Sequence, residues 1–273
     1  MSNVLVALES AATKRGFVDR VLAQYADMFE EAETVFVKPN VVSDETYPTT
    51  TDPFVLDAVL TFLSGHRVVV GDGPAYDYSW RGKAGAVPQG HPLRHVCDAH
   101  GVKLVNLNLR KHVKRQTPYG FDLSLSVVPR SFDLKISLPV LKRHVTCTMT
   151  GAIKNQFGLL DLGQRSAMHR GTPDIHKAIA AIASIEPCNL FILDAVETLL
   201  QAEEVRHGGK QALLGYMLAG IDPLALDSAG FDLLKWRDRS LKHQSAQDVA
   251  HLAYAAEFGV GSLNYTLVDF WGQ

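Results

Sequence analysis

The stretch from Pro139 to His169 concentrates the side chains best suited to proton transfer and anion binding. It reads PVLKRHVTCTMTGAIKNQFGLLDLGQRSAMH and holds four lysines or arginines, two histidines and a single carboxylate. A buried core helix would be less polar, and an exposed helix would carry more carboxylates. The excess of positive charge predicts a site for a small anion such as a carboxylate, phosphate or enolate.

Within this stretch, Lys142 and Arg143 are the residues expected to hold the anion. Thr150 and Gly151 stand where a helix is expected to begin, and the free N–H groups of a helix N-terminus favour an anion. Asn155 adds an amide to the same set.

Lys154 has two readings. Its apolar neighbours, Ile153 and Phe157, would partly desolvate the amine and lower its pKa, which suits a base, a nucleophile or a cofactor anchor. Alternatively, its stem packs on those neighbours while the ammonium reaches water.

His144 and His169 are candidate acid–base groups or metal ligands, with His169 the candidate for a metal. The cysteines number three, Cys97, Cys147 and Cys188, and form no C-x-x-C pair. No iron–sulfur cluster is therefore expected from this chain alone, and the sparse count fits a reducing, cytoplasmic compartment.

Short apolar runs alternate with helical patterns, which predicts an α/β fold: a mostly parallel sheet, or sheets, flanked by helices. We expect one compact unit or two closely packed lobes, treated as a single α/β unit over 1–273 without an appended ferredoxin domain. The predicted strands are Val4–Leu8, Thr34–Val37, Arg67–Val70, Lys103–Val105, Leu134–Leu138, Leu190–Leu193 and Leu213–Leu218.

Helix starts are marked at Asp52-Pro53, Thr172-Pro173, Asp222-Pro223 and Ser245, and an apolar helical face runs from Phe17 to Phe29. Irregular loops are expected over 72–89, 158–172 and 201–210.

Polar side chains follow several predicted strands, and ligands bind at the carboxyl ends of parallel strands. The sequence thus predicts one crevice that gathers the anion-binding segment with residues from other strands. These are Lys38, Asn40, Asp72 and Asp194.

The net charge of −2 offers no global attraction for nucleic acid. The chain shows no signal peptide and no apolar run of membrane-spanning length. A small anionic ligand is the expected partner, not nucleic acid and not a membrane.

Three strings of residues together resemble the domain of unknown function family number 362. They are Leu138 to His144, Thr150 to Gly158 (TGAIKNQFG) with the later His169, and Val37-Lys38-Pro39-Asn40 with the later Thr49 and Thr50. Leu193-Asp194-Ala195 and Asp222 with Ala225-Leu226-Asp227 extend the likeness over most of the chain. Many members of that family carry a bacterial-type ferredoxin segment. Since this chain lacks one, electron transfer would need a separate ferredoxin.

A more distant similarity is to lactate racemase and its relatives, which use a nickel-pincer nucleotide. His144, Lys154 and His169 stand in the order of a histidine, a cofactor-anchoring lysine and a nickel-ligating histidine. The turn from Tyr47 to Pro53 is similar to their substrate-side turn. The glycines that flank the lysine in that family are replaced here by Ala152-Ile153 and Phe157. The resemblance implies a nickel-pincer nucleotide or a divalent metal as the possible cofactor.

The expected function is an enzyme that acts on a small anionic molecule by lysine and histidine acid–base chemistry, as in a racemase or isomerase. Two alternatives stay open. One is a non-catalytic protein that binds or delivers an anionic cofactor, and the other is a redox subunit that works with a separate ferredoxin.

Overall fold

A computed structural model describes residues 2–8, 13–75, 77, 90–171 and 174–270. Its centre is an eight-stranded sheet with the order β12-β1-β11-β10-β7-β2-β3-β4. Every neighbouring pair in this order is parallel except the two that involve β11, which runs antiparallel to β1 and β10. The prediction of a mostly parallel α/β sheet is confirmed. The strands are β1 (Ser2–Leu8), β2 (Thr34–Pro39), β3 (Arg67–Asp72), β4 (Lys103–Asn106), β7 (Leu134–Leu138), β10 (Leu190–Leu200), β11 (Lys210–Gly220) and β12 (Tyr265–Asp269).

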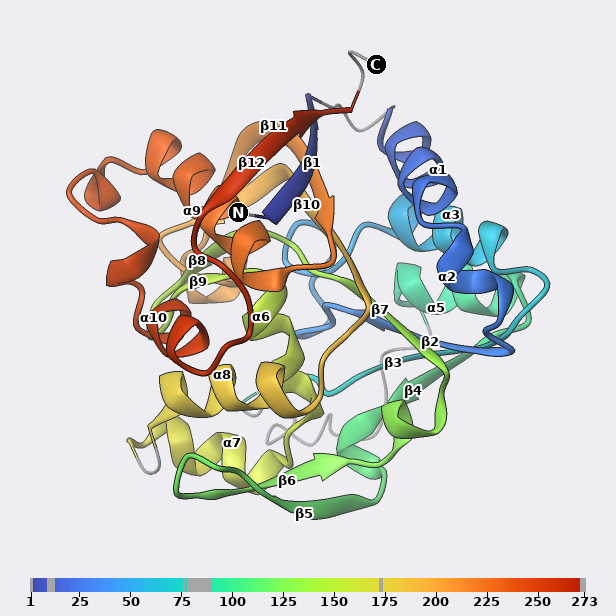
Figure 1. Ribbon diagram of the computed structural model, residues 1–273, viewed down its shortest axis with the longest axis horizontal. Coiled ribbons are helices and arrows are strands. Elements are labelled where there is room, and N and C mark those ends of the chain that lie inside the picture. The colour runs from blue at the N-terminus through green and yellow to red at the C-terminus, as the bar shows by residue number, and fades with distance from the viewer. Residues whose placement is uncertain (1, 9–12, 76, 78–89, 172–173, 271–273) are drawn as a thin grey trace.

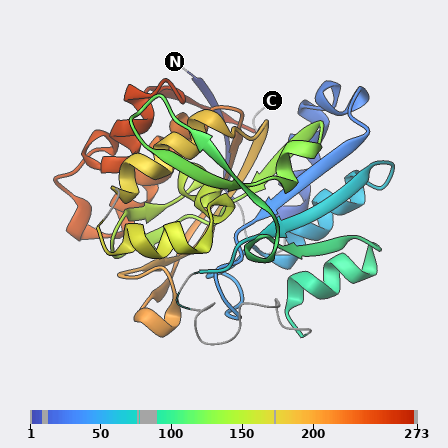
Figure 2. The same ribbon diagram turned by 90° about the horizontal axis from the view of Figure 1, so that it is seen from below.

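Helices cover both faces of this sheet, as expected when parallel strands are joined by crossovers (Figure 1). One layer holds α1 (Lys14–Gln24), α2 (Asp27–Glu30), α3 (Pro53–Phe62) and α5 (Pro92–Ala99). The other holds α6 (Ala152–Asn155), α7 (Leu162–His169), α8 (Ile175–Ile185), α9 (Pro223–Arg237) and α10 (Ala250–Glu257). Seen from below, the first layer lies on the blue and cyan side and the second on the yellow to red side (Figure 2).

Two apolar cores result because successive side chains of a strand point to opposite faces of the sheet. In β2, Val35 and Val37 pack with α1 and α3, whereas Phe36 packs in the core on the other side. In β10, Leu190 and Ile192 belong to the α1 side and Phe191 and Leu193 to the opposite one. Alternate positions along a strand therefore face opposite layers, and this parity (odd or even position) decides which layer a side chain can reach.

The cap residues read from the sequence start their helices as expected. Asp52 accepts the Phe54 N–H at 2.9 Å at the start of α3, and Asp222 accepts two N–H groups at the start of α9. Ser245 and Asp248 form the predicted capping box before α10. Thr172-Pro173, predicted to open α8, lies outside the described residues, and Asp174 caps that helix.

Some local predictions were wrong. The apolar face from Phe17 to Phe29 is split between α1 and α2 by a turn at Tyr25 and Ala26. The segment 158–172, expected to be irregular, contains α7, which Asp161 caps through the N–H groups of Gly163 and Gln164.

Two short antiparallel ribbons lie outside the main sheet and were not predicted. One pairs β5 (His112–Gln116) with β6 (Asp122–Ser126), and the other pairs β8 (Lys142–His144) with β9 (Thr148–Thr150). The strands of the second ribbon have only three residues each, too few for an alternating pattern to stand out in the sequence. The second ribbon carries part of the candidate site.

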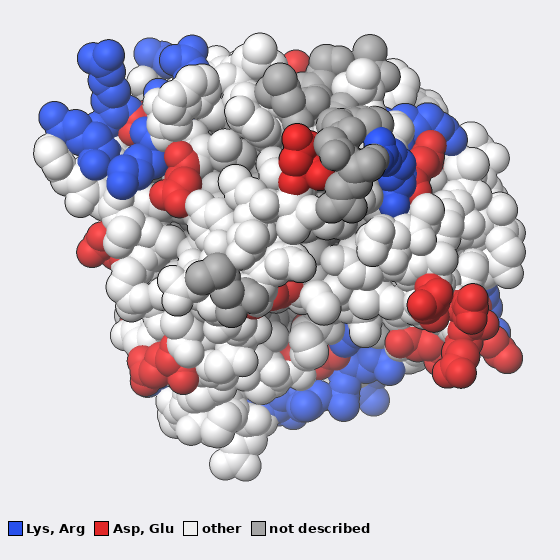
Figure 3. Space-filling model, turned by 45° about the horizontal axis from the view of Figure 1, so that its top comes forward, with Lys and Arg blue, Asp and Glu red and all other residues white. Residues whose placement is uncertain are grey.

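On the face shown in Figure 3, lysines and arginines lie in small groups, several of them beside aspartates and glutamates, between wide areas of other residues. This distribution agrees with a net charge of −2. Among the described residues, no helix has both the length and the apolar character required to cross a membrane.

Candidate functional site

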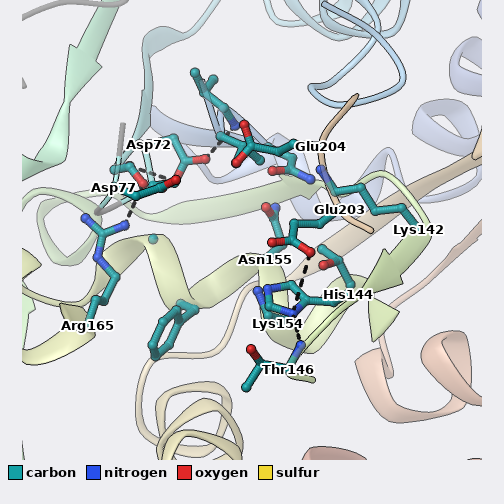
Figure 4. A pocket seen from close by; sticks show the side chains of 18 of the residues that line it. Asp72, Asp77, Lys142, His144, Thr146, Lys154, Asn155, Arg165, Glu203 and Glu204 are labelled. Carbon is teal, nitrogen blue, oxygen red and sulfur yellow. Dashed lines mark hydrogen bonds and ion pairs between the residues drawn. The ribbon is translucent and has the colours of Figure 1, made fainter. Parts of the chain in front are cut away.

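A cavity of about 340 Å³ opens where β2 and β3 end, beside the ribbon β8–β9, at the edge where parallel sheets bind ligands. Asp72, Asp77 and Arg165 lie at one end, and Lys142, His144 and Lys154 lie toward the other (Figure 4). Eight of the residues predicted for the site line this cavity: Asn40, Asp72, Lys142, His144, Thr150, Lys154, Asn155 and His169.

The ribbon β8–β9 decides which cationic side chains reach the cavity. Lys142 pairs with Thr150 and His144 with Thr148, so these side chains share one face of the ribbon. Lys142, His144 and Thr150 line the cavity, whereas Arg143 points to the other face, where it bonds the Thr148 carbonyl at 2.6 Å and Asp238 at 3.0 Å. The structure thus does not bring Arg143 to the anion site predicted for it.

Lys142 is buried, and its ammonium donates to the Thr49 carbonyl. The pKa of Lys142 is lowered to about 7, mainly by burial; the charge of Glu204 opposes this shift and that of Lys154 adds to it. Thr49 and Thr50 do not line the cavity. Their hydroxyls bond Glu45, at its carboxylate and its carbonyl, and so hold the turn that presents the carbonyl to Lys142.

His144 has its Nδ1 committed to the backbone. This nitrogen accepts the N–H groups of Thr146 and Cys147, each at 3.1 Å. Since Nδ1 is an acceptor, the neutral ring carries its hydrogen on Nε2. Burial lowers the pKa of His144 well below its usual value, and the positive charge of Lys154 lowers it further.

His169 has the opposite arrangement. Its Nδ1 lies 2.7 Å from the Arg165 carbonyl, one helical turn back in α7, so Nδ1 carries the hydrogen and Nε2 is the acceptor. Burial lowers the pKa of His169, which favours the neutral ring. An acceptor Nε2 with a bonded Nδ1–H is the form required of both a general base and a metal ligand.

Lys154 projects from the short helix α6 into the cavity. Among the described residues, its amine makes no ion pair and no hydrogen bond, and its Nζ lies 5.8 Å from the centroid of the Phe157 ring. The two other cationic side chains that line the cavity, and Lys38 behind it, have partners. Lys38 bonds Asp72, Lys142 bonds a carbonyl, and Arg165 bonds the carbonyls of Gly73 and Pro74. Burial lowers the pKa of Lys154.

The N-terminus of α6 does not offer free N–H groups to an external anion, contrary to the prediction for Thr150 and Gly151. The two oxygens of Asp227 accept the N–H groups of Ala152 and Ile153 at 2.6 and 2.9 Å. A Cβ on Gly151 would lie 2.1 Å from Asp227 Oδ1, so glycine is what allows this contact. Thr150 still lines the cavity, and its buried hydroxyl has no partner among the described residues.

Asp72 organises the end of β3. It accepts from Lys38 Nζ at 2.6 Å, from Val41 N–H at 2.7 Å and from Gly73 N–H at 2.7 Å. Lys38 therefore lies behind Asp72 and does not line the cavity. Asn40 lines it with a buried amide nitrogen that has no partner among the described residues, while the amide of Asn155 bonds Ser137.

Asp194 lies on the other side of the sheet from the cavity. It shares the parity of Leu190 and Ile192 in β10, so it faces α1, where Lys14 bonds it at 2.7 Å. Lys14 also bonds Asp52 at 2.6 Å, and the Tyr47 hydroxyl donates to Asp194 at 3.0 Å. The predicted crevice thus gathers Asp72 and His144 but not Asp194.

Sequence reasoning missed Arg165 and an acidic group on the loop between β10 and β11. Glu203 accepts the Val145 N–H at 3.1 Å and lies 4.0 Å from His144 Nδ1. Glu204 is bonded twice by Arg206 at 2.7 Å, and Arg206 also lies 2.9 Å from Asp77. The doublet Glu203-Glu204 in a segment predicted to be an irregular loop was the available signal.

Within the described part of the chain, the group of side chains with metal-binding geometry is Asp77, Glu204 and His207. His169, the predicted metal ligand, is not in this group. Arg206 pairs with both Glu204 and Asp77, so these carboxylates share a cationic partner.

The residues fit a nickel-pincer nucleotide only in part. Lys154 and His169 line one cavity, and His169 Nε2 is an acceptor as a metal ligand must be. However, Asp227 occupies the N–H groups of α6 that would otherwise favour a phosphate group. The residues present therefore supply only part of what this nucleotide would need.

Comparison with known proteins gives distant relatives. The chain is 25% identical over 262 residues to the thylakoid-associated protein sll1697 of Synechocystis, a match that covers 92% of this chain and 79% of the relative. Among solved structures, it is similar to the lactate racemase apoprotein of Thermoanaerobacterium thermosaccharolyticum, with a TM-score of 0.48 and 13% identity, covering 81% of this chain and 54% of that one. A Thermotoga maritima protein gives a TM-score of 0.46 and 12% identity, covering 81% and 59%.

The chain thus spans little more than half the length of these two solved chains. The family profile described as "Domain of unknown function (DUF362)" matches residues 35–232, which include the described cavity residues from Asn40 to His207. Because this match extends over more than half of the sequence, the chain belongs to that family.

Proposed function

We propose that this protein is an enzyme that moves a proton at the carbon next to the carboxylate or carbonyl group of a small anionic molecule, with Lys154 as the base. The observation that carries the proposal is the state of Lys154. Its amine lies in a cavity, its pKa is lowered by burial, and it has no bonding partner among the described residues. A lysine amine becomes a base when it is desolvated in this way.

The other cationic groups would hold the charge of the ligand while Lys154 takes the proton. Lys142 and Arg165 line the same cavity and are each fixed by backbone carbonyls. His169 would handle protons on the second side of the ligand, since its Nε2 is the acceptor nitrogen. Lys154 and His169 both lie next to the Phe157 ring, His169 with its ring centroid 6.0 Å away.

Proton abstraction can be measured without knowing the net reaction. The protein, purified from its own host, is incubated in deuterium oxide with a panel of 2-hydroxy, 2-oxo and 2-amino carboxylates. Deuterium incorporation next to the carboxylate is then followed by NMR. The native protein should catalyse exchange in at least one class, and Lys154→Met should lose it by a factor of about 100 or more.

Two variants make this test specific. Lys103→Met removes an exposed lysine on the edge strand β4 and should leave exchange unchanged. Lys154→Arg keeps the positive charge but provides no base at neutral pH, so it should lose exchange while retaining anion affinity. Full exchange in Lys154→Arg would reject the base assignment. Tight anion binding by the native protein with no exchange in any class would support a non-catalytic binding protein instead.

A further inference from the structure

Three buried side chains that line the cavity, on β8, on β9 and just after β2, present hydrogen-bond donors. His144 carries its hydrogen on Nε2, because Nδ1 accepts two backbone N–H groups. The Thr150 hydroxyl is buried without a partner among the described residues, and so is the amide nitrogen of Asn40. His144, Thr150 and Asn40 are only 6%, 5% and 5% exposed, so these donors depend on a ligand or on water for their hydrogen bonds.

The ribbon brings two of these donors together. Thr150 is the cross-strand partner of Lys142, and His144 stands two residues beyond Lys142 on the same face. Diagonal neighbours of this kind are about 7 to 8 Å apart at Cα, close enough for both side chains to reach one small ligand.

We propose that His144 acts as a neutral hydrogen-bond donor that, with Thr150 and Asn40, binds one oxygen-rich end of a carboxylate ligand. The inference rests on the proposed function and assigns the two histidines different roles. Negative charge develops on the carboxylate oxygens as the neighbouring carbon loses its proton, and fixed donors stabilise that charge. His144 would thus hold the oxyanion, and proton transfer would fall to Lys154 and His169.

The surroundings of His144 favour the neutral ring. Lys142 on its own strand, Lys154 on α6 and His251 on α10 all disfavour a second proton, as does His169 on α7. Glu203, at 4.0 Å from Nδ1, is the one carboxylate among the described residues that faces it. Protonation of Nδ1 would also break both bonds from Thr146 and Cys147. A neutral imidazole donates a hydrogen bond without giving up its proton, as an oxyanion site requires.

The alternative is that His144 serves only to hold the turn between β8 and β9. Asparagine performs the same turn-capping task through its side-chain oxygen, since it too can accept N–H groups two and three residues ahead. His144→Asn therefore keeps the Nδ1-like acceptor and removes the Nε2 donor. His144→Gln is the matched variant, because its amide nitrogen reaches the position of Nε2 and still donates.

Affinity for oxalate, a planar carboxylate probe, separates the two roles by isothermal titration calorimetry. His144→Asn should bind oxalate about tenfold more weakly or worse, because one hydrogen bond to a charged group is lost. His144→Gln should stay within about threefold of the native protein. Full affinity in His144→Asn, or equal losses in both variants, would overturn the inference.

The tautomer itself is read from the ligand-free protein by long-range ¹H–¹⁵N NMR of histidine-labelled samples, with His144→Gln identifying the signals. His144 should show a protonated Nε2 and an unprotonated Nδ1 from pH 6 to pH 8, and His169 the reverse. A protonated Nδ1 on His144 would refute the donor role alone. Failure of the native protein to bind oxalate would instead count against the proposed function.

Discussion

At the scale of residues, the ribbon β8–β9 separates two neighbours that look equivalent in the sequence. Lys142 faces the cavity, whereas Arg143 is bonded to Thr148 and Asp238 on the other side. Lys142→Ala should weaken oxalate binding by about tenfold, the cost of one charge-assisted contact. Arg143→Ala should change it by less than about twofold. Calorimetry on the two single variants checks this, and a larger loss in Arg143→Ala would contradict the placement.

The lowered pKa of Lys142 predicts how oxalate binding depends on pH. Below about pH 7 the ammonium is charged and attracts the anion, and above that value the amine becomes neutral. Affinity should therefore fall as the pH rises through about 7, and oxalate should bind together with a proton near that pH. Lys142→Met should remove most of this dependence, because it keeps the apolar stem without the titrating group. Affinity that stays level between pH 6 and pH 9 would contradict the shift.

Part of the site was accessible from the sequence at this scale. Lys142, His144, Lys154 and His169 were all predicted, since their types and density stand out. The placements of Arg143 and Asp194 were not, yet both follow from strand alternation once the strands are known. Asp194 shares the parity of Leu190 and Ile192, which face α1. The tautomers of the histidines depend on backbone groups that no residue pattern reveals.

At the scale of elements, Gly151 and Asp227 set the position of α6 and hence of Lys154. A Cβ on Gly151 would meet Asp227 Oδ1 at 2.1 Å, while a Cβ on Gly65 would meet nothing within 4 Å. Gly151→Ala should lower the free energy of unfolding by about 2 kcal/mol or more, because the cap must move. Gly65→Ala, the control, should stay within about 1 kcal/mol of the native protein. Urea denaturation of both variants decides, and equal stability would show that α6 does not depend on this contact.

Asp227, which caps α6, also makes the stability of the protein depend on pH. Burial raises its pKa to about 7 from an ordinary value of 3.8, so between those values the folded state binds a proton that the unfolded state has lost. The contribution of Asp227 to stability thus falls as the pH rises from about 4 to about 7 and is level above that. Asp227→Asn does not titrate. The stability of the native protein relative to this variant should therefore drop by more than about 1 kcal/mol between pH 5 and pH 8.

Urea unfolding of both proteins at several pH values measures that difference, and a constant difference would contradict the raised pKa.

The sequence indicated that a helix begins near Gly151, but not which residue caps it. The cap comes from a residue 75 positions later, and only the packing of α9 beside α6 brings it there. The capped helix α7 was overlooked for a different reason, since eight residues with mixed polarity form no clear apolar stripe.

At the scale of the molecule, Lys14 joins three elements on the side of the sheet opposite the cavity. It is fully buried and bonds Asp52 at the start of α3 and Asp194 in β10, with the Tyr47 ring centroid 3.7 Å from Nζ. Lys14→Met would leave two buried carboxylates without a cation, at a cost of about 3 to 5 kcal/mol. Adding Asp52→Asn and Asp194→Asn should restore part of the lost stability, because asparagine oxygens can still accept the backbone N–H groups of Phe54 and Val196.

Thermal and urea unfolding of the single and triple variants check this prediction. A triple variant no more stable than Lys14→Met would show that the burial of unpaired charges does not cause the loss of stability.

The overall architecture was predictable because strand runs, helix caps and their alternation are local features. The buried ion pairs were not, since Lys14 and Asp194 are 180 residues apart and meet only in the folded chain.

The central claim is that Lys154 is an unpaired amine held in a cavity built for an anion. NMR of the lysine side chains, with Lys154→Met to assign the signal, measures its pKa directly. The account predicts a pKa below the ordinary lysine value of 10.5 in the free protein, rising when oxalate is added. A Lys154 that titrates at 10.5 or above and does not respond to oxalate would contradict it.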